Sequence, residues 1–146
     1  MVERGNLHVT LAFLGVRPAA DVQAVFEALR AAVAGVTEPP VLRPLRYRET
    51  RSVGMLVFDD EGGRAGTVAA DLHERLERLG VYTREARPWL PHVTVLRFRR
   101  QPRLRPALPD LPPFSPSEAA VYHSLLRRGG AQYQMLASVP LGDVGG

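Results

Sequence analysis

The 146-residue sequence contains no cysteine, which excludes a disulfide framework, a zinc–thiolate site and a cysteine nucleophile. No apolar run reaches the roughly 18–20 residues that are needed to cross a bilayer. The first residues also lack the layout of a secretory signal peptide. We therefore expect a cytoplasmic protein that has no membrane partner.

Lysine and isoleucine are absent as well, so all 19 basic residues are arginine. Against 15 acidic residues they give a net charge of +4, a balance that by itself suggests a nucleic-acid partner. The joint loss of two residue types is typical of a GC-rich coding sequence. The abundance of arginine therefore says little about partners, and the positions of individual arginines are more informative.

The length suits one domain, which we expect to comprise residues 1–146. Apolar residues recur at helical spacing over 19–34 and 64–79, and the second helix should end at Gly80. Alternating patterns predict strands at 6–14, 41–49, 53–58 and 92–98, followed by a hairpin of strands 118–126 and 131–139. The proline- and arginine-rich stretch 101–116 predicts a loop. The fold class is thus α+β, with antiparallel sheets and two helices on the outside.

One tetrapeptide is repeated: His8-Val9-Thr10-Leu11 returns as His92-Val93-Thr94-Val95. Each copy lies in a predicted strand, where the side chains of His and of the Thr two residues later point to one face, about 6.6 Å apart. Independent residue frequencies predict only about 0.16 His-x-Thr matches in such a chain, so chance does not explain two.

The repeat fits phosphoryl transfer by acid–base catalysis. Imidazoles titrate near neutral pH, so one can accept a proton from water while the other donates a proton to a leaving oxygen. Threonine hydroxyls can donate hydrogen bonds to the non-bridging phosphate oxygens. No metal or other cofactor is required if the substrate is already activated, as a strained 2′,3′-cyclic phosphate is.

Three stretches of sequence resemble a known family. They are NLHVTLAFLG at 6–15, RPWLPHVTVLRFRR at 87–100 and VYHSLLRRGGAQYQMLASVPL at 121–141. They look like the RNA 2′,3′-cyclic phosphodiesterases, also called 2′-5′ RNA ligases, of the 2H phosphoesterase superfamily, whose mark is a pair of HxTx motifs. The resemblance covers essentially the whole chain. It implies a bilobal fold with a pseudo-two-fold axis, in which two antiparallel sheets form a central cleft and the helices lie outside.

The resemblance also implies the reaction and the roles of the site residues. The reaction is metal-independent hydrolysis of an RNA 2′,3′-cyclic phosphate end to a 2′-phosphomonoester. His8 would donate a proton to the leaving 3′-oxygen, His92 would activate water, and Thr10 and Thr94 would hold the phosphate. The family's arginine five residues after the second histidine matches Arg97. Strict alternation turns Arg97 away from the face of His92, unless a bulge brings it round.

The chain begins closer to its first motif than the family usually does. Family members carry a strand and a helix, on the order of three dozen residues, before that motif, whereas only seven residues precede His8. Either the start is truncated or this member lacks the unit. The family is expected to be monomeric, but a missing unit would expose an apolar strand edge and favour a dimer.

Several alternatives remain open at the level of sequence. The expected partner is RNA with a 2′,3′-cyclic phosphate end or a small cyclic-phosphate nucleotide. The same site could instead act on a 2′-5′ linkage or join RNA as a ligase, and a non-catalytic RNA-end binding module is a third possibility. Of the remaining histidines, we expect His73 on a solvated helix face and His123 in a structural role. Trp89 and Phe13 could stack a base or line the core, and the arginines of 97–105 could bind an RNA backbone.

Overall fold

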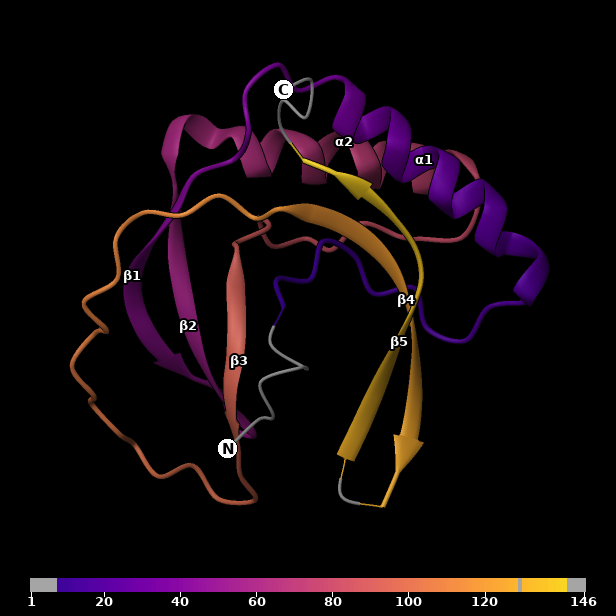
Figure 1. Ribbon diagram of the computed structural model, residues 1–146. Coiled ribbons are helices and arrows are strands. Elements are labelled where there is room, and N and C mark those ends of the chain that lie inside the picture. The colour runs from indigo at the N-terminus through magenta and orange to yellow at the C-terminus, as the bar shows by residue number, and fades with distance from the viewer. Residues whose placement is uncertain (1–7, 129, 142–146) are drawn as a thin grey trace.

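A computed structural model of the chain describes residues 8–128 and 130–141. Two antiparallel sheets are present in this part, a three-stranded sheet of order β1-β2-β3 and the hairpin β4-β5. Figure 1 shows α1 and α2 side by side along one end of both sheets. The predicted α+β class, with two antiparallel sheets and two outer helices, is confirmed. The elements in chain order are η2 (Ala19–Asp21), α1 (Val22–Ala34), β1 (Leu42–Glu49), β2 (Val53–Asp60), η3 (Glu61–Gly63), α2 (Arg64–Arg78), β3 (His92–Arg97), β4 (Glu118–Arg127) and β5 (Gly130–Pro140).

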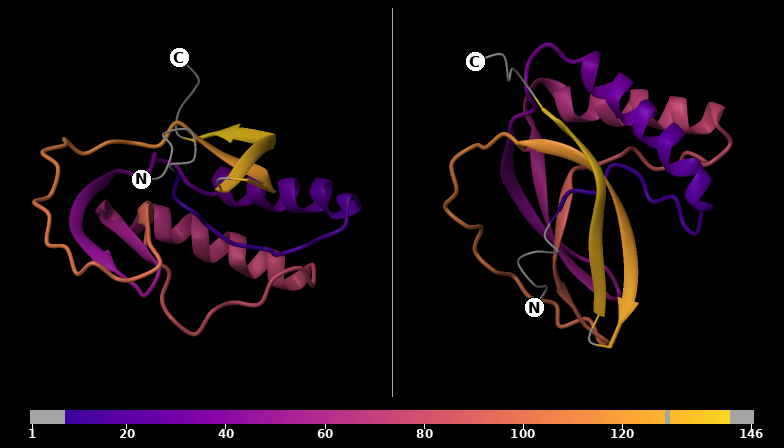
Figure 2. Two further views of the ribbon diagram at one scale, coloured as in Figure 1. Left: turned by 90° about the horizontal axis from the view of Figure 1, so that it is seen from below. Right: turned by 45° about the vertical axis from the view of Figure 1, so that its right-hand side comes forward.

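The two helices lie close to their predicted ranges because each carries one apolar stripe. Both stripes face a larger core that also contains Val81 and Ala119, and burial of such a stripe is what stabilises a helix of this length. α1 packs on the hairpin and α2 packs on β2, as Figure 2 shows. α2 ends at Arg78, and Gly80, which follows the C-cap residue Leu79, has a φ of 75° in the left-handed region that favours glycine. The buried residues of the helices are Val25, Ala28, Leu29, Ala32, Val33, Ala65, Val68, Ala69, Leu72, His73 and Leu76.

The start of α2 is held by the end of β2. β2 runs two residues beyond its predicted end and finishes at Asp60. The Asp60 carboxylate accepts hydrogen bonds from the backbone N–H groups of Ala65 and Gly66, at 2.9 and 2.7 Å. A carboxylate at this position satisfies otherwise unpaired amides and complements the helix dipole. Asp60 therefore joins the end of β2 to the start of α2.

The strand predicted at 6–14 is wrong for the residues that the structure describes; positions 6 and 7 lie outside them. Only Val9 forms a β-bridge, to Val93. The carbonyls of Thr10 and Leu11 accept hydrogen bonds from side chains, and no neighbouring strand forms a ladder with them. Alternation is lost too, because Leu11, Ala12 and Leu14 all pack against the larger core. Phe13, which alternation would place on the apolar face, is 79% exposed.

The loop predicted at 101–116 is confirmed, and hydrogen bonds join it to the three-stranded sheet at two points. Phe114 pairs with Leu42 through two backbone hydrogen bonds of 2.8 and 2.9 Å, and its ring meets Phe58 edge-on. Near the other end of the loop, the backbone N–H groups of Arg103 and Leu104 donate to the Glu49 carboxylate at 2.8 and 2.9 Å. In the described residues, no helix is long and apolar enough to span a bilayer.

The hydrogen bonds to the Glu49 carboxylate predict that this end of the loop detaches from the sheet at acidic pH. Partial burial acts to raise the pKa of Glu49, but hydrogen bonds from the Tyr47 hydroxyl and the Leu104 and Arg103 amides outweigh it and lower the pKa. A lowered pKa means that the stabilisation is fully present above the ordinary glutamate pKa of about 4.3 and is lost as the pH falls through the folded value. In an NMR titration from pH 7 to pH 3, the two amide resonances should hold their positions down to about pH 4.3 and shift together below it.

The control is Glu49→Gln, in which this transition should be absent. A transition at or above about pH 4.3 would contradict the prediction.

Tyr47 titrates at the alkaline end of the pH scale. Partial burial, together with its 2.7 Å hydrogen bond to Glu49, raises its pKa to about 12. The contribution of the phenol is therefore complete below about pH 10 and is lost as the pH rises through about 12.

Candidate active site

The second motif forms the start of β3, as predicted. Val93 packs against a smaller core that is built on Leu42, Phe58 and Ala65. Since alternate residues of a strand point to opposite faces, His92 and Thr94 lie on the face away from that core. Both are half-buried. The strand therefore presents an imidazole and a hydroxyl on the same face.

The first motif lies beside the second through an antiparallel bridge between their central valines. This bridge places His8 opposite Thr94 and Thr10 opposite His92. Val9 packs against the same smaller core as its partner, so all four motif side chains share the face away from it. In antiparallel pairs, opposite Cβ atoms lie about 4.5–5.5 Å apart and diagonal ones about 7–8 Å apart. The structure thus brings the four residues into a rectangle, with the two imidazoles at opposite corners.

Arg97 joins this face because β3 contains a bulge. The register between β2 and β3 shifts after Thr94, which leaves Val95 without a partner. The extra residue reverses the alternation beyond it, so Arg97 is exposed on the face that carries His92. The pairing with β2 shows the same grouping. The β2 residues opposite His92, Thr94 and Arg97 are Val57, Met55 and Val53, which are alternate residues on one face of β2.

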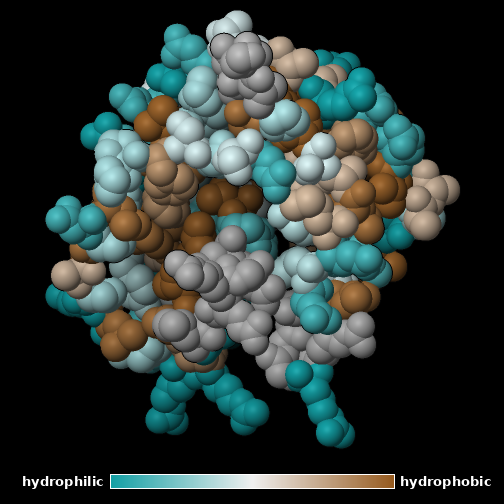
Figure 3. All heavy atoms as spheres, in the orientation of Figure 1, coloured by the Kyte–Doolittle hydropathy of each residue, from teal (hydrophilic) through white to brown (hydrophobic). Residues whose placement is uncertain are grey.

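The hairpin supplies aromatic residues that the sequence analysis missed. The His8 ring lies edge-on to Tyr133 at a centroid distance of 4.7 Å and is stacked on Tyr122 at 6.2 Å. In Figure 3 the surface is hollowed between the part formed by β1–β3 and the part formed by the hairpin. Alternation along the hairpin groups these tyrosines on one face, but no local signal indicates which face meets the first motif. His123, by the same alternation, lies on the other face and is exposed.

A backbone carbonyl fixes the tautomer of His92. His92 Nδ1 lies 2.9 Å from the carbonyl oxygen of Leu90. A carbonyl can only accept, so Nδ1 carries the proton and Nε2 of the neutral ring keeps its lone pair. This tautomer equips His92 to accept a proton through Nε2.

Two side-chain donors, one buried and one half-buried, hold the backbone of the first motif. Trp89 Nε1 donates to the Thr10 carbonyl at 3.0 Å, and His73 Nε2 donates to the Leu11 carbonyl at 2.7 Å. The expectation that His73 is solvated is wrong. Its side chain is 6% exposed and its ring lies 4.9 Å from that of Tyr82, because its position falls within the buried stripe of α2. Trp89 packs against the smaller core and has a structural role.

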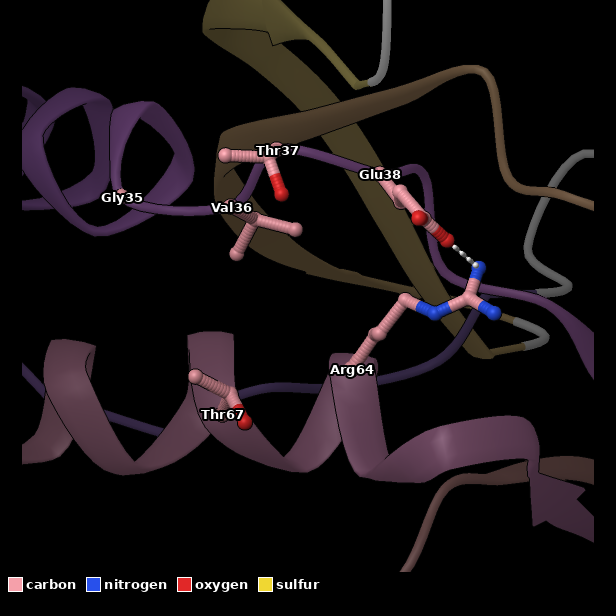
Figure 4. A pocket seen from close by; sticks show the side chains of 6 residues that line it. All are labelled: Gly35, Val36, Thr37, Glu38, Arg64 and Thr67. Carbon is pink, nitrogen blue, oxygen red and sulfur yellow. Dashed lines mark ion pairs between the residues drawn. The ribbon is translucent and has the colours of Figure 1, made fainter.

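A pocket of about 330 Å³ lies elsewhere, between the end of α1 and the start of α2 (Figure 4). Arg64 is its most strongly polar group, but the guanidinium donates to the Pro39 carbonyl at 2.8 Å and pairs with Glu38 at 3.4 Å. None of the predicted site residues contributes to this pocket. It is lined by Gly35, Val36, Thr37, Glu38, Arg64 and Thr67.

No cluster of three or more His, Cys, Asp or Glu side chains that could hold a metal ion occurs in the described part of the chain. The candidate site therefore consists of the motif residues His8, Thr10, His92 and Thr94, with Arg97 on the same face. Its functional groups are two imidazoles, two hydroxyls and a guanidinium. These groups can move protons and bind an anion.

Comparison with known proteins identifies the family. The profile of the 2′-5′ RNA ligase superfamily matches residues 1–130, and the chain belongs to this superfamily of 2H phosphoesterases. Escherichia coli LigT in complex with 3′-AMP is similar in structure, with a TM-score of 0.77 and 25% identity over 97% of this chain and 80% of LigT. The Thermus thermophilus protein TT0787 has a TM-score of 0.75 and 27% identity over 97% of this chain and 82% of its own. No curated protein sequence matches the chain.

Proposed function

We propose that this phosphoesterase hydrolyses the 2′,3′-cyclic phosphate at an RNA 3′ end to a 2′-phosphomonoester, without a metal ion. The observation that carries the proposal is the rectangle formed by His8, Thr10, His92 and Thr94. It supplies an acid, a base and two hydroxyl donors on one face of the sheet. The similarity to LigT, whose structure was determined with a nucleotide monophosphate, supports a nucleotide end as the substrate.

His92 acts as the base in this reaction. Its Nδ1 proton is held by the Leu90 carbonyl, so Nε2 accepts a proton from a water molecule as the water oxygen bonds to phosphorus. The Thr10 and Thr94 hydroxyls donate to the non-bridging oxygens, on which negative charge develops in the transition state. Arg97, which is exposed on the same face, adds positive charge at the edge of the site.

His8 acts as the acid from the opposite corner. As the bond between phosphorus and the 3′-oxygen breaks, the imidazolium donates its proton to that oxygen. The products are a free 3′-hydroxyl and a 2′-phosphomonoester. His92 is left protonated and His8 neutral, and proton exchange with solvent restores both. The ring contacts with Tyr122 and Tyr133 fix the orientation of His8.

A substrate panel assayed in excess EDTA tests the function. RNA ending in a 2′,3′-cyclic phosphate should be converted to the 2′-phosphomonoester, which ³¹P NMR distinguishes from the 3′-isomer. The comparison substrates are a 2′-5′-linked oligonucleotide and a pair of RNA halves that a ligase could join. Faster turnover of a comparison substrate, or loss of all activity in EDTA, would overturn the proposal. Binding of the cyclic-phosphate RNA with no product would indicate the non-catalytic module instead.

A further inference from the structure

β1 carries two arginines in register with the motif residues of β3. Across the three-stranded sheet, Arg48 pairs with Met55, which pairs with Thr94. One row further along, Arg46 pairs with Val57, which pairs with His92. Adjacent strands lie about 4.8 Å apart, so each arginine starts about 10 Å from the motif residue in its row.

A bulge in β1 decides which face these arginines occupy. The register shifts between Pro44 and Arg46, and Leu45 is the extra residue. Beyond it, Tyr47 and Glu49 lie on the covered face, where the Tyr47 ring fills the space that a side chain at Gly54 would need. Arg46 and Arg48 therefore lie on the other face and are exposed there. This is the face of His92, Thr94 and Arg97.

The charge of these arginines is not neutralised within the described part of the protein. Neither Arg46, Arg48 nor Arg97 forms an ion pair there, whereas seven other arginines do: Arg30, Arg43, Arg64, Arg75, Arg78, Arg84 and Arg87. A guanidinium without a carboxylate partner can form two parallel hydrogen bonds with a phosphate. Although arginine is abundant throughout this chain, the unpaired ones on this face lie in line with the candidate site.

We propose that Arg46 and Arg48 bind backbone phosphates of the RNA strand on the 5′ side of the cyclic end, so that the enzyme favours an RNA chain over a mononucleotide. The inference rests on the proposed function, since it places the cyclic phosphate between the two motifs. From there the strand crosses β2 towards β1. A single-stranded polyanion fits a row of exposed guanidinium groups, because each contact releases a counterion from the RNA.

The test compares two substrates on one variant. The double variant Arg46→Gln/Arg48→Gln is assayed on a 2′,3′-cyclic mononucleotide and on a short RNA that ends in the same nucleotide and cyclic phosphate. The ratio of kcat/KM for the RNA to kcat/KM for the mononucleotide should fall roughly tenfold, and the change should lie in KM. The slope of log kcat/KM for the RNA against log salt concentration should become shallower by about 1.4, which is about 0.7 for each lost phosphate contact. The matched control is Arg30→Gln/Arg78→Gln, which removes two arginines that are paired on helices.

Each outcome bears on the inference. An unchanged substrate ratio, or an equal effect of the control variant, would overturn it. If the wild-type protein turns over neither substrate, the proposed function fails, and fluorescence anisotropy with a 3′-phosphorylated RNA decides the inference separately. The Arg46/Arg48 variant should then bind this RNA roughly tenfold more weakly and with a smaller salt slope than the control variant. Equal affinities of the Arg46/Arg48 variant and the control variant for this RNA would overturn the inference, independently of the proposed function.

Discussion

Replacing His92 with alanine is expected to lower kcat roughly 10²- to 10⁴-fold, and His8→Ala should have an effect of the same size. In the proposed mechanism each variant removes one of the two proton transfers, whereas Thr10 and Thr94 remain to hold the phosphate. The loss should therefore lie in kcat, with little change in KM. Steady-state kinetics on a cyclic-phosphate RNA, with EDTA present, would measure both parameters.

The pH dependence of the two variants separates their roles. A base and an acid together give a bell-shaped profile of kcat/KM. His92→Ala should lose the rise on the acidic side, because no imidazole has to be deprotonated to accept the proton of water. His8→Ala should lose the fall on the alkaline side. The hydrogen bond from His92 Nδ1 to the Leu90 carbonyl is the reason for this assignment, and the opposite pattern would reverse the roles.

The matched control is His123→Ala. This histidine is exposed on β4, on the hairpin face away from His8. The kcat of the His123→Ala variant should therefore stay within about twofold of the wild-type value. Thermal unfolding of all three variants shows whether they remain folded. If His8→Ala or His92→Ala keeps its fold together with kcat within about tenfold of the wild type, acid–base catalysis by this pair is wrong.

Replacing His73 with leucine is expected to destabilise the protein by about 2–4 kcal/mol and to lower kcat as well. Leucine retains the apolar bulk but cannot donate to the Leu11 carbonyl, which then loses its 2.7 Å partner. The ring contact with Tyr82 is lost at the same time. Urea denaturation measures the first effect, and kinetics under conditions where the variant is folded measures the second.

The activity loss distinguishes positioning from simple stability. Leu11 directly follows Thr10 and lies three residues after His8, so a shift of its backbone displaces both functional side chains. His73→Gln, which restores an N–H donor, should recover part of kcat. Val81→Ala removes volume from the same core without touching this hydrogen bond. It should cost stability while leaving kcat unchanged. If His73→Leu and Val81→Ala affect kcat equally, a positioning role for His73 is wrong.

Local patterns in the sequence predicted most of the elements. Helix-period stripes predicted α1 and α2, and alternation predicted β1, β2, β3 and the hairpin. These patterns succeed because they record which side chains of one element share a face, over separations of two to four residues. The repeated His-x-Thr string also depends only on the order of residues. The sequence alone was therefore sufficient to select the candidate catalytic residues.

Contacts between distant segments decided the rest. The first motif is held by His73 and Trp89, 62 and 79 residues from their carbonyl partners, so a pattern that looks like a strand makes a single bridge. Bulges at Leu45 and Val95 bring Arg46, Arg48 and Arg97 to the face of His92. Register across a sheet and the burial of a polar side chain depend on partners far away in the sequence. The sequence by itself thus selected the candidate catalytic residues, and only the tertiary structure decided which of them meet.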